Sequence, residues 1–256
     1  MRRIVFSHFF NESYLLPWWL KHHREIFEHG VLIDYASTDE SAAICRELVP
    51  SWEIIASENP NFAAVMADFE VMKHEQRFPD CWKIALNTTE FLIASNLAQA
   101  EQLILANNLT GMRLPGAIMI DPDPTAEPDY KRPLVSQKAS GVFESAFDFN
   151  AMRIPGLSFP TRNRLYHRYA IGAYTPGRHG THLPGIVDGT SDFGAVWWYA
   201  FSPWTAAFRA RKLSIAPRRD PFDKRYGFGV QHEVNGAELN LRWAKLVAQS
   251  KPLTVA

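Results

Sequence analysis

Short apolar runs alternate with longer amphipathic stretches between residues 4 and 105, and this alternation constrains the fold more than any other feature of the chain. The runs have the length of buried strands, and the stretches have the helical spacing of apolar residues. We predict strands over residues 4–6, 31–34, 52–56 and 82–86, and helices over 15–27, 42–48, 62–77 and 97–105. This order predicts an α/β fold with a mainly parallel central sheet flanked by helices.

The rest of the chain has a less regular pattern. Proline and acidic residues crowd positions 121–133, and glycine, proline and histidine interrupt positions 134–200. We expect a strand over residues 165–171, a helix after Pro203 and a last helix over residues 236–248.

The charge balance and the cysteine content limit the partners and the cellular compartment that we expect. The 27 lysines and arginines equal the 27 aspartates and glutamates, so the balance gives no reason to expect nucleic acid as a partner. The two cysteines, Cys45 and Cys81, argue against a disulfide scaffold and suit a reducing cytoplasm. No apolar run approaches the ~20 residues of a membrane span, so we expect a cytoplasmic protein with at most peripheral membrane contact.

Polar residues follow three of the predicted strands, at positions 8–12, 34–39 and 87–90. Ligands of open parallel sheets bind at the carboxyl ends of the strands, so these segments are the candidate site. Asp34 ends its strand, where its carboxylate can accept hydrogen bonds from a base or from ribose hydroxyls. Asp39 either caps the next helix, which we favour slightly, or contacts the ligand.

Two blocks of sequence resemble family-2-like glycosyltransferases. An Asn-Glu pair, Asn11 and Glu12, precedes residues 15–23 (LLPWWLKHH), and residues 34–39 (DYASTD) follow the second predicted strand. The order and spacing of these blocks are more specific than either block alone. The resemblance implies the GT-A fold, in which a nucleotide-sugar-binding half (residues 1–110) and an acceptor-binding half with a C-terminal helix (residues 111–256) form one domain.

The resemblance continues at residues 82–92 (WKIALNTTEFL), which stand where the family has a strand ending in Asp-x-Asp-Glu-Phe-Leu, and at residues 227–232 (GFGVQH), which resemble a glycine-rich turn ending in a histidine. The donor-binding residues that it implies are Asn11, Asp34, Asp39, Asn87, Thr89 and His232. Asn87 and Thr89 replace the two aspartates, so the Asp-x-Asp motif is altered and only Glu90 keeps its charge.

The altered motif leaves three alternatives open, because a divalent ion such as Mn²⁺ or Mg²⁺ prefers carboxylate oxygens. The enzyme is metal-independent, with basic groups stabilising the leaving diphosphate; or it binds a metal weakly through Glu90 and His232; or it retains donor binding without catalysis. We favour the metal-independent or weakly metal-dependent alternatives.

Sugar transfer with inversion, the commoner outcome in this family, needs a base that reaches the acceptor hydroxyl. Our catalytic candidates are Asp192, His179 and Glu90, with Asp188 and Glu144 behind them. The basic stretch contains Arg209, Arg211, Lys212, Arg218, Arg219, Lys224 and Arg225. It faces either a diphosphate or solvent, and we favour a solvated face. The aromatic residues Trp197, Trp198, Tyr199 and Trp204 are expected to be core.

The function that follows is transfer of a hexose from a nucleoside diphosphate sugar, expected to be UDP-linked, to a hydroxyl of a saccharide or lipid-linked acceptor in polysaccharide biosynthesis. The alternative is an inactive nucleotide-sugar-binding or saccharide-binding protein on the same fold. Nucleotidyl transfer ranks last, because residues 7–13 contain no glycine-rich phosphate loop.

Overall fold

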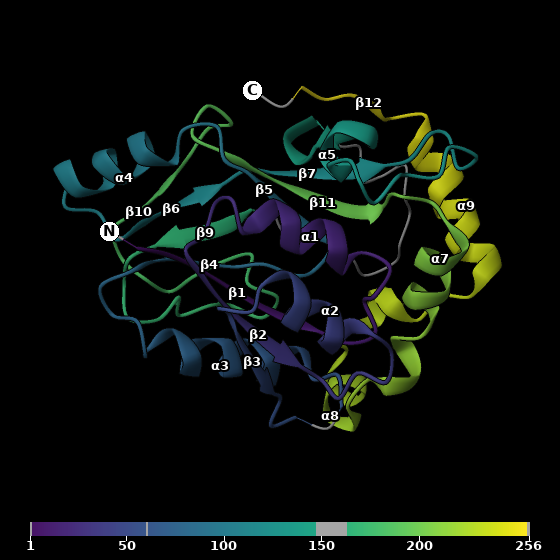
Figure 1. Ribbon diagram of the computed structural model, residues 1–256, viewed down its shortest axis with the longest axis horizontal. Helices are drawn as coiled ribbons and strands as arrows, with labels where there is room; N and C mark the ends of the chain where they lie inside the picture. Colours follow the sequence, from purple (N-terminus) through teal and green to yellow (C-terminus); the bar gives the residue numbers. More distant parts are fainter. Residues whose placement is uncertain (1, 60, 147–162, 255–256) are drawn as a thin grey trace.

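The computed structural model describes residues 2–59, 61–146 and 163–254, and within these residues two sheets form the centre of the molecule (Figure 1). The larger sheet has the strand order β10-β6-β9-β4-β1-β2-β3. Its strands are β1 (Arg3–Phe9), β2 (His29–Asp34), β3 (Glu53–Ala56), β4 (Trp82–Ala85), β6 (Gly111–Leu114), β9 (Arg164–His167) and β10 (Ile186–Asp188). Strand β1 runs parallel to β2 and β4, whereas β9 runs antiparallel to β4 and β6.

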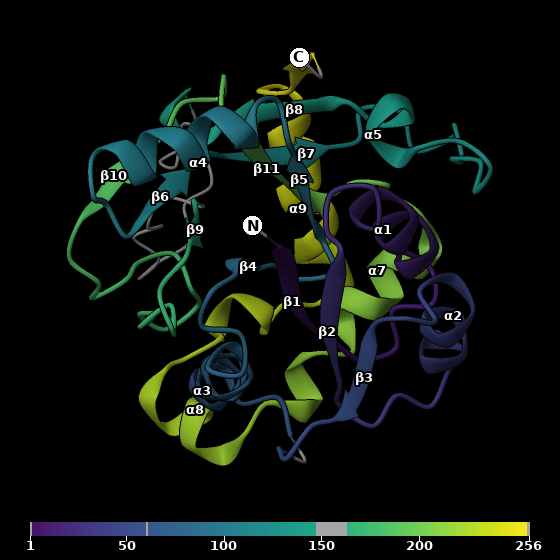
Figure 2. The same ribbon diagram turned by 60° about the vertical axis from the view of Figure 1, so that its left-hand side comes forward.

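Successive side chains of each strand point to opposite faces of the sheet, so both faces of the larger sheet carry apolar side chains, and helices cover both. They are α1 (Leu16–His23), α2 (Ser41–Leu48), α3 (Ala64–Glu75) and α4 (Leu97–Ala106). Ile4 and Phe6 of β1 pack with Val71 of α3, while Val5 packs in a core that also holds Cys45 of α2. Figure 2 shows α3 and α2 on opposite sides of β1, β2 and β3.

The smaller sheet has the order β12-β8-β7-β11-β5. Its strands are β5 (Glu90–Ile93), β7 (Gly116–Ile120), β8 (Ser140–Phe143), β11 (Ala195–Phe201) and β12 (Lys251–Pro252). Helices α7 (Ala206–Leu213) and α9 (Gly236–Val247) pack on it through a core that includes Ile118, Phe208 and Leu246. The remaining helical segments are α5 (Leu134–Gln137), η1 (Glu144–Ala146), η2 (Ala216–Arg218), α8 (Pro221–Tyr226) and η3 (Val230–His232).

The predicted α/β class is confirmed, with a larger sheet that is mainly parallel and flanked by helices. The predicted strand over residues 165–171 is shorter and ends at His167. The smaller sheet was not predicted. The halves also interleave, because β5 joins the smaller sheet while β6, β9 and β10 join the larger one. None of the helices in the described part of the chain is both long and apolar enough to cross a lipid bilayer.

Candidate functional site

A cavity of about 250 Å³ opens beside the carboxyl ends of β1 and β4. His8, near the end of β1, and Asn87 and Thr89, which follow β4, line one part of it. Residues 198–201 of β11 line another part, so both sheets contribute to its wall. The cavity therefore lies at the sheet edge at which the sequence predicts the site.

Glu90 and Arg164 form a buried ion pair in the wall of this cavity, with side chains that are 3% and 1% exposed. Arg164 Nε donates to Glu90 Oε2 over 2.8 Å, and Arg164 Nη2 donates to Oε1. Asn87 adds a backbone N–H bond to Oε2 at 2.7 Å and a side-chain bond to Oε1 at 3.2 Å. Each carboxylate oxygen of Glu90 thus accepts hydrogen bonds from two donors.

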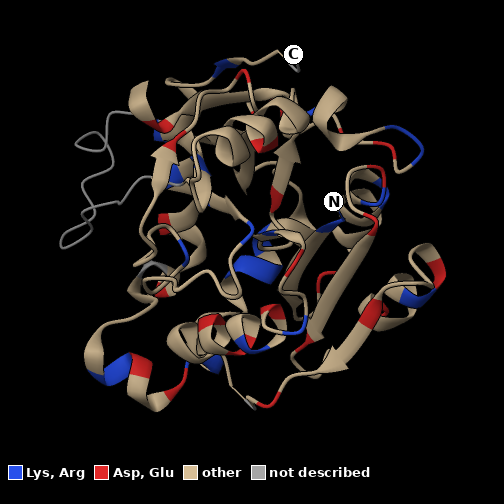
Figure 3. Ribbon diagram, turned by 90° about the vertical axis from the view of Figure 1, so that its left-hand side faces the viewer, with Lys and Arg blue, Asp and Glu red and all other residues tan. Residues whose placement is uncertain are grey.

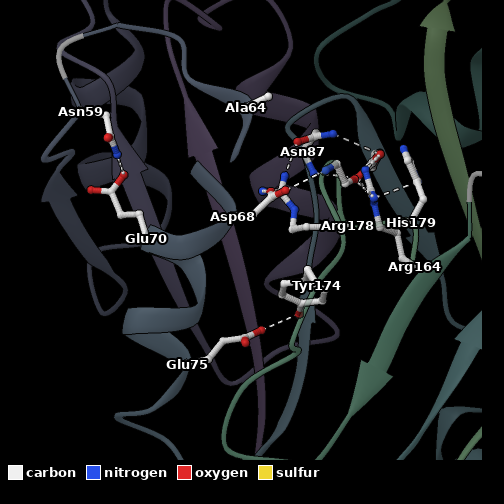
Figure 4. A network of polar contacts seen from close by, with 12 residues as sticks. Asn59, Ala64, Asp68, Glu70, Glu75, Asn87, Arg164, Tyr174, Arg178 and His179 are labelled. Carbon is white, nitrogen blue, oxygen red and sulfur yellow. Dashed lines mark hydrogen bonds and ion pairs between the residues drawn. The ribbon is translucent and has the colours of Figure 1, made fainter. Parts of the chain in front are cut away.

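A second buried ion pair joins Arg178 to Asp68 of α3. Arg178 Nη1 donates to Asp68 Oδ1 over 2.6 Å, and the backbone N–H of Gly177 donates to Oδ2 over 2.7 Å. The other guanidinium nitrogen, Nη2, donates to Asn87 Oδ1 over 2.6 Å. Figure 4 shows the side chains of Asp68, Arg178 and Asn87 pointing toward one another. Burial raises the pKa of the Asp68 carboxyl, and the charge of Arg178 opposes that rise.

The loop that carries Arg178 is held at a second point of α3. Glu75 lies seven residues after Asp68, so the two carboxylates share one face of the helix. Glu75 Oε1 accepts a hydrogen bond from the Tyr174 hydroxyl at 2.5 Å (Figure 4). Its Oε2 accepts one from the Gly172 N–H at 2.6 Å. Two carboxylates of α3 therefore position this loop, which sequence reasoning did not anticipate.

His179, a predicted catalytic residue, lines the cavity beside Arg164. Its Nδ1 lies 3.0 Å from Arg164 Nη1. Nδ1 also lies 3.4 Å from the Asn163 carbonyl oxygen. The guanidinium only donates and the carbonyl only accepts, so the two contacts call for opposite roles of Nδ1 and do not fix the tautomer. The role of His179 as a base stays a prediction.

Glu12 is fully buried and pairs with Arg211 of α7 across the cavity wall. Burial raises the pKa of Glu12, and the charge of Arg211 opposes the rise. The pair links the segment after β1 to a helix about 200 positions later in the chain.

The cavity wall carries a positive excess. Its basic residues are Arg164, Arg178, Arg211, Lys212, Arg218 and Arg242, and its acidic residues are Glu12, Asp68 and Glu90. The expectation of a solvated basic face is therefore wrong for Arg211, Lys212 and Arg218, although Lys224 and Arg225 are exposed. Elsewhere the two signs of charge are interspersed along the chain (Figure 3).

One sequence signal could have identified the basic residues that face the cavity. Arg211 and Lys212 lie three and four residues after Phe208, so they share the face of α7 that packs inward. Phe208 itself is fully buried, and Lys212 Nζ lies 5.6 Å from the centre of its ring. Among the aromatic residues expected in the core, Trp198 is half-buried and lines the cavity.

Three predicted donor-binding residues form a separate network beside the cavity. Asn11 Oδ1 accepts hydrogen bonds from the backbone N–H of Thr38 at 2.8 Å and of Asp39 at 3.3 Å. Asp39 Oδ1 accepts from the N–H of Ser41, the first residue of α2, at 3.0 Å, but the N-cap position itself is occupied by Glu40, which makes no side-chain cap hydrogen bond. Asp34 Oδ1 accepts from the backbone N–H three residues later at 2.9 Å. These three residues do not line the cavity.

The other predicted catalytic residues lie apart from the cavity. Asp192 is exposed and precedes the first residue of β11, whereas the cavity lies at the last residues of that strand. Asp188 is exposed and pairs with Arg113, and Glu144 is buried in η1. These placements do not support a catalytic role. His232, predicted from the glycine-rich turn, does line the cavity.

The donor atoms at the altered motif do not fit a divalent ion. Both oxygens of Glu90 already accept hydrogen bonds, and the adjacent guanidinium of Arg164 repels a second cation. Asn87 Oδ1 is occupied by Arg178. Across the described residues, no group of three or more His, Cys, Asp or Glu side chains is placed to hold a metal ion.

No protein-family model matches the chain, and no curated protein sequence matches it either. Solved structures do match. TarS from S. aureus is 12% identical, with a TM-score of 0.43, over 96% of this chain and 71% of that one. Glucosyl-3-phosphoglycerate synthase from Mycobacterium tuberculosis, solved with Mn²⁺, UDP and glucosyl-3-phosphoglycerate, is 10% identical, with a TM-score of 0.43, over 95% of this chain and 80% of that one.

A protein from Bacillus anthracis assigned as a glucose-1-phosphate thymidylyltransferase is 9% identical, with a TM-score of 0.41, over 94% of this chain and 99% of that one. Each of these likenesses has a TM-score below 0.5. At these identities and TM-scores the likeness assigns no donor, acceptor or activity to this chain.

Proposed function

We propose that this chain transfers a hexose from a UDP-linked sugar to a hydroxyl of a saccharide or lipid-linked acceptor, without a divalent metal. The observation that carries the proposal is the positively charged cavity at the altered motif, where the one remaining acid, Glu90, is paired with Arg164. The sequence blocks around Asn11, Asp34 and Glu90 give the donor class.

The chemistry needs stabilisation of the negative charge that develops on the leaving UDP. In enzymes of the Asp-x-Asp kind a metal ion supplies that charge, whereas fixed cations that face a cavity supply it here. Arg178 and Arg211 are already held by Asp68 and Glu12, so they need little reorganisation when a diphosphate enters. His179 takes up the proton of the acceptor hydroxyl as the acceptor oxygen bonds to the sugar carbon and the bond from that carbon to UDP breaks. Inversion at the sugar stays a prediction from the family resemblance.

A non-catalytic nucleotide-sugar-binding protein is the second candidate, and the replacement of two aspartates by Asn87 and Thr89 favours it. Both candidates bind the donor, so binding alone does not separate them. Only the enzyme releases UDP when an acceptor is added.

The test has two steps. Calorimetric titration with UDP, GDP and their hexose conjugates identifies the donor, and a UDP-release assay with a panel of saccharide and glycolipid acceptors then measures turnover. We expect UDP binding and acceptor-dependent UDP release. Binding without release for any acceptor would favour the binding protein, and the absence of nucleotide binding would contradict both candidates.

A further inference from the structure

Several nitrogens in the cavity wall have no hydrogen-bond partner among the described residues. Arg178 Nε, Arg211 Nε and His8 Nδ1 are all buried and unpaired in this sense. All three residues line the cavity. Leaving a buried polar group unpaired costs about 1–3 kcal/mol. The same wall also contains the Glu12 carboxylate oxygens and the Tyr14 and Tyr35 hydroxyls, which are unpaired in the same sense. The charges of Arg178 and Arg211, and not the unpaired atoms alone, therefore favour a ligand that offers acceptor oxygens.

Arg164 shows that the unpaired nitrogens are not a general property of this wall. Its Nε and Nη2 bond to Glu90, and its Nη1 bonds to the Gly177 carbonyl oxygen at 2.6 Å and contacts His179. The guanidinium of Arg164 is therefore fully engaged within the protein. Arg178 and Arg211 instead pair with Asp68 and Glu12 through their terminal nitrogens, and the Nε of each arginine has no hydrogen-bond partner among the described residues.

Arg218 adds a cation without a carboxylate partner among the described residues. Its Nη2 donates to the Tyr35 carbonyl oxygen at 3.1 Å, and its guanidinium lies 3.2 Å from the centre of the Phe10 ring. Burial and the nearby charge of Arg211 lower the pKa of Arg218. Two guanidinium groups of like charge thus face one cavity, and an anion between them would relieve their repulsion.

His8 lies within the field of the same cations. Burial lowers the pKa of His8 well below its ordinary value, and the charges of Arg178, Arg211 and Arg164 lower it further. Its ring also makes an edge contact with Tyr35, with the ring centres 5.5 Å apart. The neutral imidazole can offer one N–H to a ligand oxygen, and a bound anion would favour addition of a second proton.

We propose that Arg178, Arg211 and Arg218, which line one cavity together with His8, form an anion subsite that holds a diphosphate group through guanidinium and imidazole nitrogens. This subsite rests on the proposed function, which it deepens by naming the residues that bind the donor's diphosphate. Guanidinium groups suit the task because several donors of fixed geometry match phosphate oxygens. The arginines come from three separate segments, the loop before His179, α7 and η2, so the subsite exists only in the folded chain.

The experiment uses inorganic pyrophosphate as the probe, titrated calorimetrically into the full chain in the presence of a chelator. Arg218→Gln is the main variant, because it removes no carboxylate pairing seen in the described residues. We expect it to weaken pyrophosphate binding by about tenfold or more, as loss of a charge-assisted contact does. Arg211→Gln should weaken binding at least as much, and its fold is checked by circular dichroism.

Arg209→Gln is the matched control, since Arg209 lies on the same helix as Arg211 but contacts the Trp204 ring and does not line the cavity. It should bind pyrophosphate as the wild type does. Wild-type protein that does not bind pyrophosphate, or an Arg218→Gln protein that binds it normally, would overturn the subsite. Equal losses in Arg209→Gln and Arg218→Gln would also overturn it, because the effect would then be one of overall charge.

Titrations with UDP and uridine separate the subsite from the proposed function. If Arg218→Gln changes neither UDP binding nor acceptor-dependent UDP release, the proposed function stands and the subsite is rejected. Arginine-dependent pyrophosphate binding without any binding of UDP would keep the subsite and reject the UDP-sugar donor. Uridine should bind far more weakly than UDP if the diphosphate provides most of the affinity.

Discussion

The guanidinium of Arg164 donates to both carboxylate oxygens of Glu90, and the pair is almost completely buried. Glu90 is the single acid that remains at the altered Asp-x-Asp motif, so its charge is neutralised inside the protein. The pair therefore leaves no net charge at this position of the cavity wall, and Arg178, Arg211 and Arg218 remain as the cations that we propose to hold the diphosphate.

Replacement of Glu90 by glutamine should strongly destabilise the fold, because the buried Arg164 would lose its counter-charge. Breaking a buried pair in this way costs about 3–5 kcal/mol. The exposed pair between Arg113 and Asp188 provides the comparison, and Asp188→Asn should cost at most about 1 kcal/mol. Urea denaturation measures both. Similar losses for the two variants would show that the Glu90 pair contributes no more than a surface contact.

Asp68→Asn should weaken UDP binding as well as stability, because Asp68 positions Arg178 and the loop before His179. Asp121 pairs with Lys138 in an equally buried ion pair that does not line the cavity. Asp121→Asn should therefore destabilise the protein without weakening UDP binding. Calorimetry on both folded variants checks this, and equal changes in UDP affinity would mean that Asp68 acts only through general stability.

Asn87→Asp should weaken UDP binding in chelator, by about tenfold if one added charge dominates. The Asn87 amide donates a hydrogen bond to Glu90 Oε1 at 3.2 Å, and a carboxylate in its place would repel Glu90. The new carboxylate would also partly neutralise the charge of Arg178. Asn87→Ala removes the same amide without adding charge. If both variants bind UDP equally, the effect comes from lost contacts and the electrostatic explanation is wrong.

His23 should make stability depend on pH. It is fully buried, and its Nε2 accepts the Leu92 N–H at 3.1 Å, so the ring proton lies on Nδ1, which donates to the Trp19 carbonyl oxygen at 2.9 Å. Burial, and then the charge of His22, lower the pKa of His23 well below its ordinary value.

The unfolded chain therefore binds a proton near pH 6.5 that the folded chain does not bind, and the contribution of His23 to stability falls as pH drops from about 6.5. The slope for one group is at most about 1.4 kcal/mol per pH unit. His23→Gln removes this titration, so the stability difference between the two proteins should shrink from pH 7.5 to 5.5. Urea denaturation that gives the same difference at every pH would contradict this.

The larger sheet could be predicted from sequence because β1, β2, β3 and β4 are local apolar runs separated by helices. The smaller sheet could not, since its strands are short and pair with distant segments. Glu90 of β5, for example, pairs with Trp198 of β11. Nothing within either segment specifies that partner.

The candidate site was predicted in part for the same reason. Asn87, Thr89 and Glu90 follow β4, so the carboxyl-end rule places them at the cavity. The sequence did not show at which end of β11 Asp192 would lie relative to the cavity, because the direction of β11 is set by pairing that the local sequence does not encode. Arg218 was expected in solvent, and only the packing of η2 against Tyr35 and Phe10 brings it to the cavity.

In the proposed mechanism the chain's own cations, and not a divalent metal, hold the donor's diphosphate. Calorimetry tests this directly if the affinity of the wild-type protein for UDP is measured once with chelator and once with manganese. We predict that UDP binds in chelator and that manganese changes its dissociation constant by less than about threefold, well under 1 kcal/mol. UDP binding that requires manganese would contradict the account, because the pairing of Glu90 with Arg164 would then have to open to admit the ion.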